Sequence, residues 1–330
     1  MPNAAITGTG FYVPDHVVTN EDLTKVMDTS DEWIQERSGI RERHWVAEGT
    51  SGIDLALPAS HQAIENAGIT PAAIDFIIYG TLNPDYQFPG NGPLLQNALG
   101  IGTVGAMDIR NQCTGFVYGL AAADGFIKAG TATCVLVVGA EIHSSGLDVT
   151  TRGRDVAVLF GDGAGAAIVQ ATDEDRGILA STLHCEGEFA KELWCEIPTA
   201  LVKGRWTDEM IAQGRHFPYM NGRNVFKHAT RRFCEAIEEV LALSGASKDD
   251  VALVIPHQAN QRITDMVTKR VELPKERVYS NIHKYGNTTA ASIPIALAEA
   301  VREGKLHRGD LLITVAFGSG FTWGANLIRW

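Results

Sequence analysis

The chain has 330 residues, of which 45% are hydrophobic and 34 are glycine, so it can bury one large core or two coupled ones. Its 39 acidic residues outnumber its 28 basic ones, and the resulting formal net charge of −11 argues against a nucleic-acid partner. No run approaches the ~18 consecutive apolar residues that cross a bilayer, so no membrane association is expected.

Apolar runs typical of strands alternate with helical patterns along the chain. The predicted strands are 76–79, 104–109, 135–138, 166–169, 253–255 and 311–316, and the predicted helices are 53–67, 114–129, 225–243 and 292–303. This alternation indicates a layered α/β fold. No Ser/Pro-rich linker or charge block divides the chain, and only 184–218 looks irregular, which favours a loop excursion or lid there.

One weak internal repeat stands out. The glycine-rich turn and strand at 160–168 resemble 317–328, one near mid-chain and the other at the end. Duplicated halves would explain this similarity, and chance likeness between glycine-rich turns is the alternative.

The five cysteines form no CxxC pair and show no metal-like spacing. An odd number of unpaired thiols is typical of a reducing compartment, so we expect a cytoplasmic protein without a metal site.

Cys113 is the first candidate for chemistry. It lies where the apolar run 104–109 has ended and the small-residue helix 114–129 begins. A thiol at a helix start meets the positive end of the helix dipole and unpaired backbone N–H groups, which favour the nucleophilic thiolate. The pattern predicts a reactive sulfur at the bottom of a pocket, with an ordinary buried cysteine as the alternative.

His257 and Asn287 lie in two similar turns. His257 directly follows the strand-like segment that ends at Pro256, and Asn287 follows Gly286 ahead of helix 292–303. Side chains on such turns converge at one end of an α/β sheet. Each of them alone would more often be structural, but a cysteine, a histidine and an asparagine together predict a catalytic site.

The positive charge gathers on two helical stretches. Arg223, Lys227 and Arg231 recur every four residues and so share one helix face, and Arg262 and Lys269 stand two turns apart in a second stretch. Such a face is either simply solvated or a docking surface for an acidic partner.

Seven segments then carry a resemblance in matching order. They are 29–34, 37–44, 111–116, 160–165, 256–260, 286–292 and 320–324. They closely resemble the motifs of the β-ketoacyl-acyl-carrier-protein synthase III family, and the likeness fails clearly only near 185–215. The resemblance implies the thiolase fold, an α/β fold with two βαβαβαββ halves (1–175 and 176–330) in a five-layered αβαβα arrangement, and a homodimer.

The resemblance also implies a reaction. Cys113 would take an acyl group from acyl-CoA as a thioester, and His257 and Asn287 would hold the carbonyl of malonyl-acyl-carrier protein as CO₂ leaves. The resulting enolate would attack the acyl thioester, with the backbone N–H groups of Cys113 and Ser319 as the oxyanion hole. The product would be a 3-oxoacyl chain on acyl carrier protein, as in the initiation of fatty acid synthesis, and no permanently bound cofactor is implied.

Further positions follow from the same motifs. Those implied for coenzyme A or its pantetheine arm are Trp33, Arg37, Asn260 and Arg152, with Arg154 as the alternative to Arg152. Those implied for the acyl pocket are Leu147, Phe160, Phe317 and Phe88, the last reaching across the dimer interface. Carrier-protein docking is implied for Lys227 and Arg262.

Some residues depart from the family pattern. Gln112 precedes the cysteine, Ser319 interrupts a glycine run, and the segment 152–160 is two residues longer than usual. These departures leave open a related ketosynthase of specialised metabolism, of quinolone or polyketide type. A Cys-His hydrolase and a non-catalytic acyl-CoA binder are further alternatives, of which the hydrolase is disfavoured because it would need Asp where Asn287 stands. The primer and the carrier of the extender unit are not predicted.

Overall fold

The first half of the chain builds a five-stranded sheet. In the computed structural model, which describes residues 1–330, its strands are β1 (Asn3–Tyr12), β4 (Phe76–Gly80), β5 (Gly105–Ile109), β6 (Cys134–Glu141) and β7 (Gly163–Thr172), in the order β1-β7-β6-β4-β5. β4 runs parallel to β5 and β6, whereas β7 runs antiparallel to β1 and β6. Every residue of β6 is buried, as expected for a central strand covered on both faces.

The second half builds a four-stranded sheet. Its strands are β8 (Gly177–Cys185), β11 (Val251–Pro256), β12 (Leu311–Gly318) and β13 (Thr322–Arg329), in the order β11-β12-β13-β8. β11 and β12 are parallel, and β13 is antiparallel to both of its neighbours. An isolated parallel bridge between Val254 and Val278 stands where a further strand would continue the sheet beyond β11.

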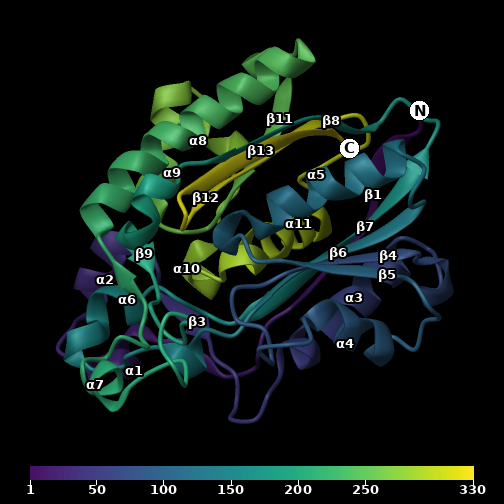
Figure 1. Ribbon diagram of the computed structural model, residues 1–330. Helices are drawn as coiled ribbons and strands as arrows, with labels where there is room; N and C mark the ends of the chain where they lie inside the picture. The colour runs from purple at the N-terminus through teal and green to yellow at the C-terminus, as the bar shows by residue number, and fades with distance from the viewer.

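Six helices form three layers around the two sheets (Figure 1). α3 (Gly52–Asn66) and α4 (Asn91–Ala98) cover the outside of the first sheet, and α8 (Gly222–Ser244) and α9 (Gln261–Val271) cover the outside of the second. Between the sheets lie α5 (Gly115–Lys128) and α11 (Ser292–Arg302), whose apolar side chains belong to the largest buried cluster. The five predicted layers are therefore present.

The element order also repeats. The first half reads β1-α3-β4-α4-β5-α5-β6-β7, which is βαβαβαββ, and the second reads β8-α8-β11-α9-α11-β12-β13 with the third strand reduced to the bridge at Val278. Each strand and helix predicted from the sequence is present. The strands before and after residue 175 form separate sheets, and the division of the chain at that residue stays a prediction.

The remaining elements are short. They are β2 (Val17–Thr19), α1 (Asn20–Thr24), α2 (Asp31–Ser38), β3 (Glu42–His44), α6 (Arg154–Ala157), β9 (Leu193–Trp194), α7 (Asp208–Ala212), β10 (Tyr219–Met220) and α10 (Ile282–Tyr285), with several 3-10 turns. β9 and β10 pair with each other within the excursion after β8. None of the helices combines the length and apolar character that crossing a lipid bilayer requires.

Arg43 of β3 is a fully buried cation that joins three segments. Its guanidinium donates to the carbonyl oxygens of Val18 and Val158 at 3.2 and 2.8 Å and to Asn20 Oδ1 at 2.8 Å. Burial lowers the pKa of Arg43 to about 10, so it remains charged at neutral pH. A buried charge of this kind is tolerated because both terminal nitrogens of the guanidinium donate to buried acceptors; only Nε has no partner.

Replacing Arg43 with Met should therefore destabilise the fold. Three buried acceptors would lose their donor, at a cost of about 3 kcal/mol, and Tm should fall by ~5 °C or more. Arg41→Met is the matched control, because Arg41 is exposed two residues away. Equal melting temperatures for the two variants in scanning calorimetry would contradict this role of Arg43.

Candidate active site

Cys113 lies at a sharp entry into the central helix α5. The short 3-10 helix η2 (Gln112–Thr114) joins β5 to α5, and its first residue, Gln112, has a left-handed φ of +46°. Gly318 at the end of β12 packs directly on the cysteine, since a Cβ built there would lie 2.7 Å from Cys113 Cβ. The nucleophile candidate is thus held between the two halves of the molecule, and it is 7% exposed.

The surroundings of the sulfur have opposing effects on the pKa of Cys113. Burial, followed by the nearby Glu141 carboxyl group, raises the pKa of Cys113 to about 12. The backbone N–H groups of Cys113 and Ser319 and the hydroxyl of Thr289 lower it, because they can donate to a thiolate. The helix start alone predicted a thiolate, but desolvation is the larger effect, so the resting sulfur is a thiol.

His257 follows β11 and is held by Ser292 at the start of α11. Its backbone N–H donates to the carbonyl of Val315 on β12 at 2.8 Å, and its Nδ1 lies 2.6 Å from Ser292 Oγ. That hydroxyl oxygen also accepts from the N–H of Gln258 at 3.4 Å, which leaves its hydrogen for Nδ1. The network therefore favours the tautomer with the imidazole proton on Nε2.

The Nε2 atom of His257 is buried and has no hydrogen-bond partner within the protein. Burial, with a smaller contribution from His143, lowers the pKa of His257 to about 3. The ring is therefore neutral at physiological pH, and an N–H at Nε2 is available to donate to a bound ligand.

Asn287 is fixed by both its backbone and its amide oxygen. Its N–H donates to Leu159 O at 2.8 Å, and its carbonyl accepts from Gly161 N at 3.1 Å. The side-chain Oδ1 accepts from the backbone N–H of Thr289 at 2.9 Å. The amide nitrogen is thus left as the free end of the side chain, and it is a donor.

The three candidates are all buried and lie on neighbouring elements. Thr289 links two of them, because its N–H donates to Asn287 Oδ1 and its hydroxyl lowers the pKa of Cys113. His257 directly follows β11, whose parallel neighbour β12 ends in the Gly318 that touches the cysteine. The structure therefore brings together a thiol and two neutral donors from distant parts of the chain.

Sequence reasoning missed three residues of this cluster. Thr289 and His143 form a 2.6 Å hydrogen bond through Oγ1 and Nε2, and both are buried. Glu141, 1% exposed, accepts from Leu82 N at 2.8 Å, and burial raises its pKa to about 8. The available signal for two of them was a pair of titratable residues at and just beyond the end of an apolar strand, Glu141 as the last residue of β6 and His143 two residues later.

The predicted coenzyme A residues divide into two groups. Trp33 of α2 has the guanidinium of Arg37 4.5 Å and that of Arg154 5.1 Å from its ring centre. Arg152 instead lies 2.5 Å from Asp148 and 5.4 Å from the ring of Phe217. The geometry thus groups Arg154, rather than the favoured Arg152, with Trp33.

Asn260 caps α9 and connects it to α2. Its Oδ1 accepts from Arg262 N at 2.9 Å, and its Nδ2 donates to Arg37 O at 2.8 Å. This amide is occupied on both sides, so its direct effect is to fix the position of Arg37.

The predicted acyl-pocket residues lie in three places. Leu147 and Phe160 belong to one buried apolar cluster, in which the ring of Phe160 packs 4.5 Å from that of His143. Phe317 belongs to the cluster between the second sheet and α8, against Phe321 at 4.7 Å. Phe88 is 82% exposed and fills no cavity of its own chain.

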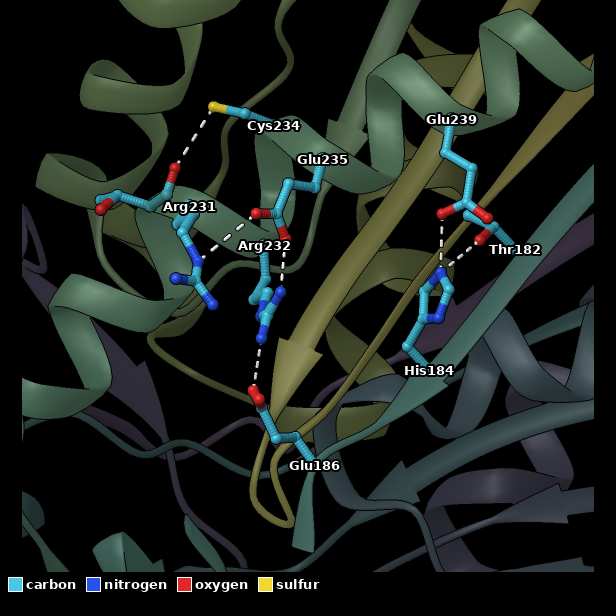
Figure 2. A network of polar contacts seen from close by, with 9 residues as sticks. Thr182, His184, Glu186, Arg231, Arg232, Cys234, Glu235 and Glu239 are labelled. Atoms are coloured by element: carbon cyan, nitrogen blue, oxygen red, sulfur yellow. Dashed lines mark hydrogen bonds and ion pairs between the residues drawn. The ribbon is translucent and has the colours of Figure 1, made fainter. Parts of the chain in front are cut away.

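Ion pairs occupy part of the basic face of α8 (Figure 2). Arg231 lies 3.4 Å from Glu235, and Arg232 bridges Glu186 at 2.5 Å and Glu235 at 2.7 Å. Arg232 thereby ties α8 to the segment just after β8, whereas the ion pair of Arg231 lies within α8.

The other cations of this face remain free of ion pairs. Arg223 and Lys227 are exposed on α8, and Arg262 and Lys269 are exposed on the neighbouring α9. The guanidinium of Arg262 lies 5.7 Å from the ring of Phe226. We call these four cations the basic patch.

Two family models match the chain. Residues 107–187 match 3-oxoacyl-[acyl-carrier-protein] synthase III, and residues 241–330 match the C-terminal part of the same enzyme. A β-ketoacyl-[acyl-carrier-protein] synthase III of Xanthomonas axonopodis pv. citri is 47% identical over 325 residues, which cover 98% of both chains. One of Roseiflexus sp. is 43% identical over 327 residues, covering 99% of this chain and 98% of that protein.

Solved structures agree with this match. The 3-oxoacyl-[acyl-carrier-protein] synthase III of Aquifex aeolicus superposes with a TM-score of 0.90 at 44% identity, covering 99% of this chain and 100% of that one. The synthase III of Thermus thermophilus gives 0.92 at 40% identity, with 99% of each chain covered. The thiolase-fold expectation is thus confirmed, and the chain belongs to the β-ketoacyl-[acyl-carrier-protein] synthase III family of acyltransferases.

Proposed function

We propose that the protein catalyses the decarboxylative condensation of an acyl-CoA primer with malonyl-acyl-carrier protein. The Cys113 sulfur attacks the acyl carbonyl and coenzyme A leaves as its thiol, which carries away the cysteine proton. Malonyl-acyl-carrier protein then loses CO₂, and the resulting enolate attacks the thioester. The C–S bond to Cys113 breaks, and 3-oxoacyl-acyl-carrier protein is released.

The observation that carries this proposal is a pair of unengaged neutral donors beside a buried thiol. His257 Nε2 has no protein partner, and the Asn287 amide is engaged only through its oxygen. A carbonyl oxygen that gains negative charge during decarboxylation needs two such donors, and a low-dielectric site strengthens both interactions.

An amide rather than a carboxylate beside the histidine fits the same chemistry. Loss of CO₂ supplies the carbanion without a base that removes an α-proton, and a second anion would oppose the enolate. A hydrolase would instead use a carboxylate to orient its imidazole as a base. Asn287 and the low pKa of His257 both disfavour the hydrolase alternative.

The assignment to fatty acid synthesis rather than to specialised metabolism is supported by the identity to family members. Relatives 43–47% identical over nearly the whole chain carry the synthase III name, whereas a priming ketosynthase of the R1128 polyketide pathway is 28% identical. The alternative in specialised metabolism is therefore less favoured, in spite of Gln112 and Ser319.

We expect two protein partners, a second copy of this chain and acyl carrier protein. β5 is an edge strand of the first sheet and Phe88 is exposed on the loop after β4, which supports a homodimer formed along that edge. The basic patch supports docking of acidic acyl carrier protein.

All five cysteines are free thiols, in keeping with a reducing compartment such as the cytoplasm.

Substitutions should separate the two half-reactions. Cys113→Ser should abolish acyl transfer from CoA but retain decarboxylation of malonyl-acyl-carrier protein, because both donors remain. Asn287→Ala should still form acyl-Cys113 but lose condensation by ~10²-fold or more. Intact-mass measurement after incubation with a panel of acyl-CoAs detects the acyl-enzyme and also identifies the preferred primer. An Asn287→Ala enzyme that cannot be acylated would contradict the assigned step.

The protonation state of His257 gives an independent test. Its pKa lies below the ordinary value because burial disfavours the cation, so the ring should stay neutral as pH falls from 8 to 5.5. ¹⁵N-histidine NMR should find the Nε2–H tautomer throughout, with His257→Gln identifying the signal. Ser292→Ala removes the partner of Nδ1 and should allow both tautomers. A titration of the wild-type signal within that range would refute the assignment.

Docking on the basic patch predicts charge-dependent kinetics. Lys227→Glu and Arg262→Glu should each raise the Km for malonyl-acyl-carrier protein by ~3–10-fold, and the difference should shrink in high salt. Lys305→Glu is the matched control, because Lys305 is exposed outside the patch. Unchanged Km values in both patch variants would exclude this surface.

A further inference from the structure

A second buried histidine, which contacts Thr289, takes no part in the reaction described above. His143 follows β6 by two residues and is 6% exposed. The one hydrogen bond of its ring joins Nε2 to Thr289 Oγ1 at 2.6 Å, and the ring packs on Phe160 with 4.5 Å between centroids. A buried imidazole beside a reactive sulfur requires an explanation.

Thr289 stands between His143 and the sulfur. It begins the 3-10 helix η8 (Thr289–Ala291), which lies against both β6 and η2. A Cβ built on Gly139 of β6 would lie 2.2 Å from Ala290 O, and one on Gly115 would lie 3.3 Å from Ala290 Cβ. These close approaches hold η8 against η2, which carries Cys113, and the Thr289 hydroxyl is one of the groups that lower the pKa of Cys113.

The backbone of Thr289 is held in an unfavourable conformation. Its φ of +50° lies in the left-handed region, which β-branched residues avoid. Its N–H is fixed by Asn287 Oδ1 at 2.9 Å and its hydroxyl by His143. Conformations of this kind persist where the surroundings impose them, and they cluster at active sites.

We propose that His143 is a positioning residue for acylation: its Nε2–H donates to Thr289 Oγ1 and so directs the single hydroxyl hydrogen of Thr289 onto Cys113 Sγ. Thr289 is then a catalytic residue in its own right, as a third donor to the thiolate beside the N–H groups of Cys113 and Ser319. The role in acylation rests on the proposed function, whereas the effect on the thiol does not.

The assignment follows from counting hydrogens. The Thr289 hydroxyl has one hydrogen and lies between two groups able to accept it, an imidazole nitrogen and a thiolate sulfur. If Nε2 carries the proton, it becomes a donor and the hydroxyl hydrogen is left for the sulfur. A fixed donor is valuable here, because desolvation is the main reason why the pKa of Cys113 is high.

Three other titratable groups surround these residues. Glu141 of β6 opposes the thiolate, and its own pKa of about 8 means that its charge changes near neutral pH. His257, after β11, is kept neutral by burial and, to a smaller extent, by His143, and burial alone keeps His143 neutral. Asp162, before β7, accepts from the backbone N–H of His143 at 2.6 Å and holds the loop. Glu141 is therefore the ionising neighbour whose effect must be controlled.

The test measures the thiol without any acyl substrate. Alkylation of Cys113 by iodoacetamide is followed by peptide mass spectrometry from pH 6 to 10 in His143→Leu, His143→Gln, Thr289→Val and Thr289→Ser. His143→Leu and Thr289→Val should each slow alkylation by about tenfold at a given pH, which shifts the rate–pH curve upward by about one unit. His143→Gln and Thr289→Ser keep a donor and a hydroxyl, so their rates should stay within about threefold of wild type.

The double variant His143→Leu/Thr289→Val should be no slower than either single variant, since both remove one donor. Repeating the series with Glu141→Gln separates the effect of the carboxyl group, and the tenfold difference should persist there. Wild-type rates in His143→Leu would overturn the proposal, as would a His143→Gln enzyme as slow as His143→Leu, because the glutamine amide keeps a donor at this position. None of these outcomes depends on whether the enzyme uses acyl-CoA, so the proposed function stands or falls separately.

Discussion

The close contact between two helix starts is the constraint on which this structure depends. α5 and α11 lie side by side between the sheets, and the turns that lead into them, η2 and η8, touch each other. Gly115, Gly139 and Gly318 permit the contact, because a side chain at Gly139 or Gly318 would collide with Ala290 or Cys113 and one at Gly115 would crowd Ala290. Both helix dipoles therefore direct their positive ends toward one small, dry region.

Dryness explains the electrostatics of that region. Burial raises the pKa values of Cys113 and Glu141 and lowers those of His143 and His257, so each of the four groups tends toward its neutral form. A negative charge is then stabilised only at positions toward which hydrogen-bond donors already point. The site can therefore keep the resting sulfur neutral and still stabilise the charge that develops on a reacting carbonyl oxygen. The free N–H of His257 and the free amide of Asn287 meet that condition without carrying a charge themselves.

The sequence was informative where a local pattern determines the local structure. The apolar run 135–138 and the small-residue stretch after Cys113 predicted β6 and α5, and the motifs predicted that Cys113, His257 and Asn287 share one site. β1 and β8 were missed because glycine, threonine and serine interrupt their apolar alternation, so their strand pairing depends on tertiary contacts. Thr289 and His143 were missed for a related reason. Their importance comes from a hydrogen bond between residues 146 positions apart, which no local pattern encodes. The choice between Arg152 and Arg154 likewise depended on which side chain reaches Trp33.

The two turns are also copies of one another. Each begins with a non-glycine residue in the left-handed region, Gln112 in one and Thr289 in the other, and each runs through three residues into a central helix. The place taken by Cys113 in the first copy is taken by Ala290 in the second. Although the turn occurs twice in each chain, only one copy therefore carries a nucleophile. An acyl group can be tethered from one direction only, and the mirror position, which carries a methyl group, offers no rival nucleophile. Because of that asymmetry the two reactants play different parts in the condensation: one is bound covalently to the protein, while the other arrives and departs on its carrier.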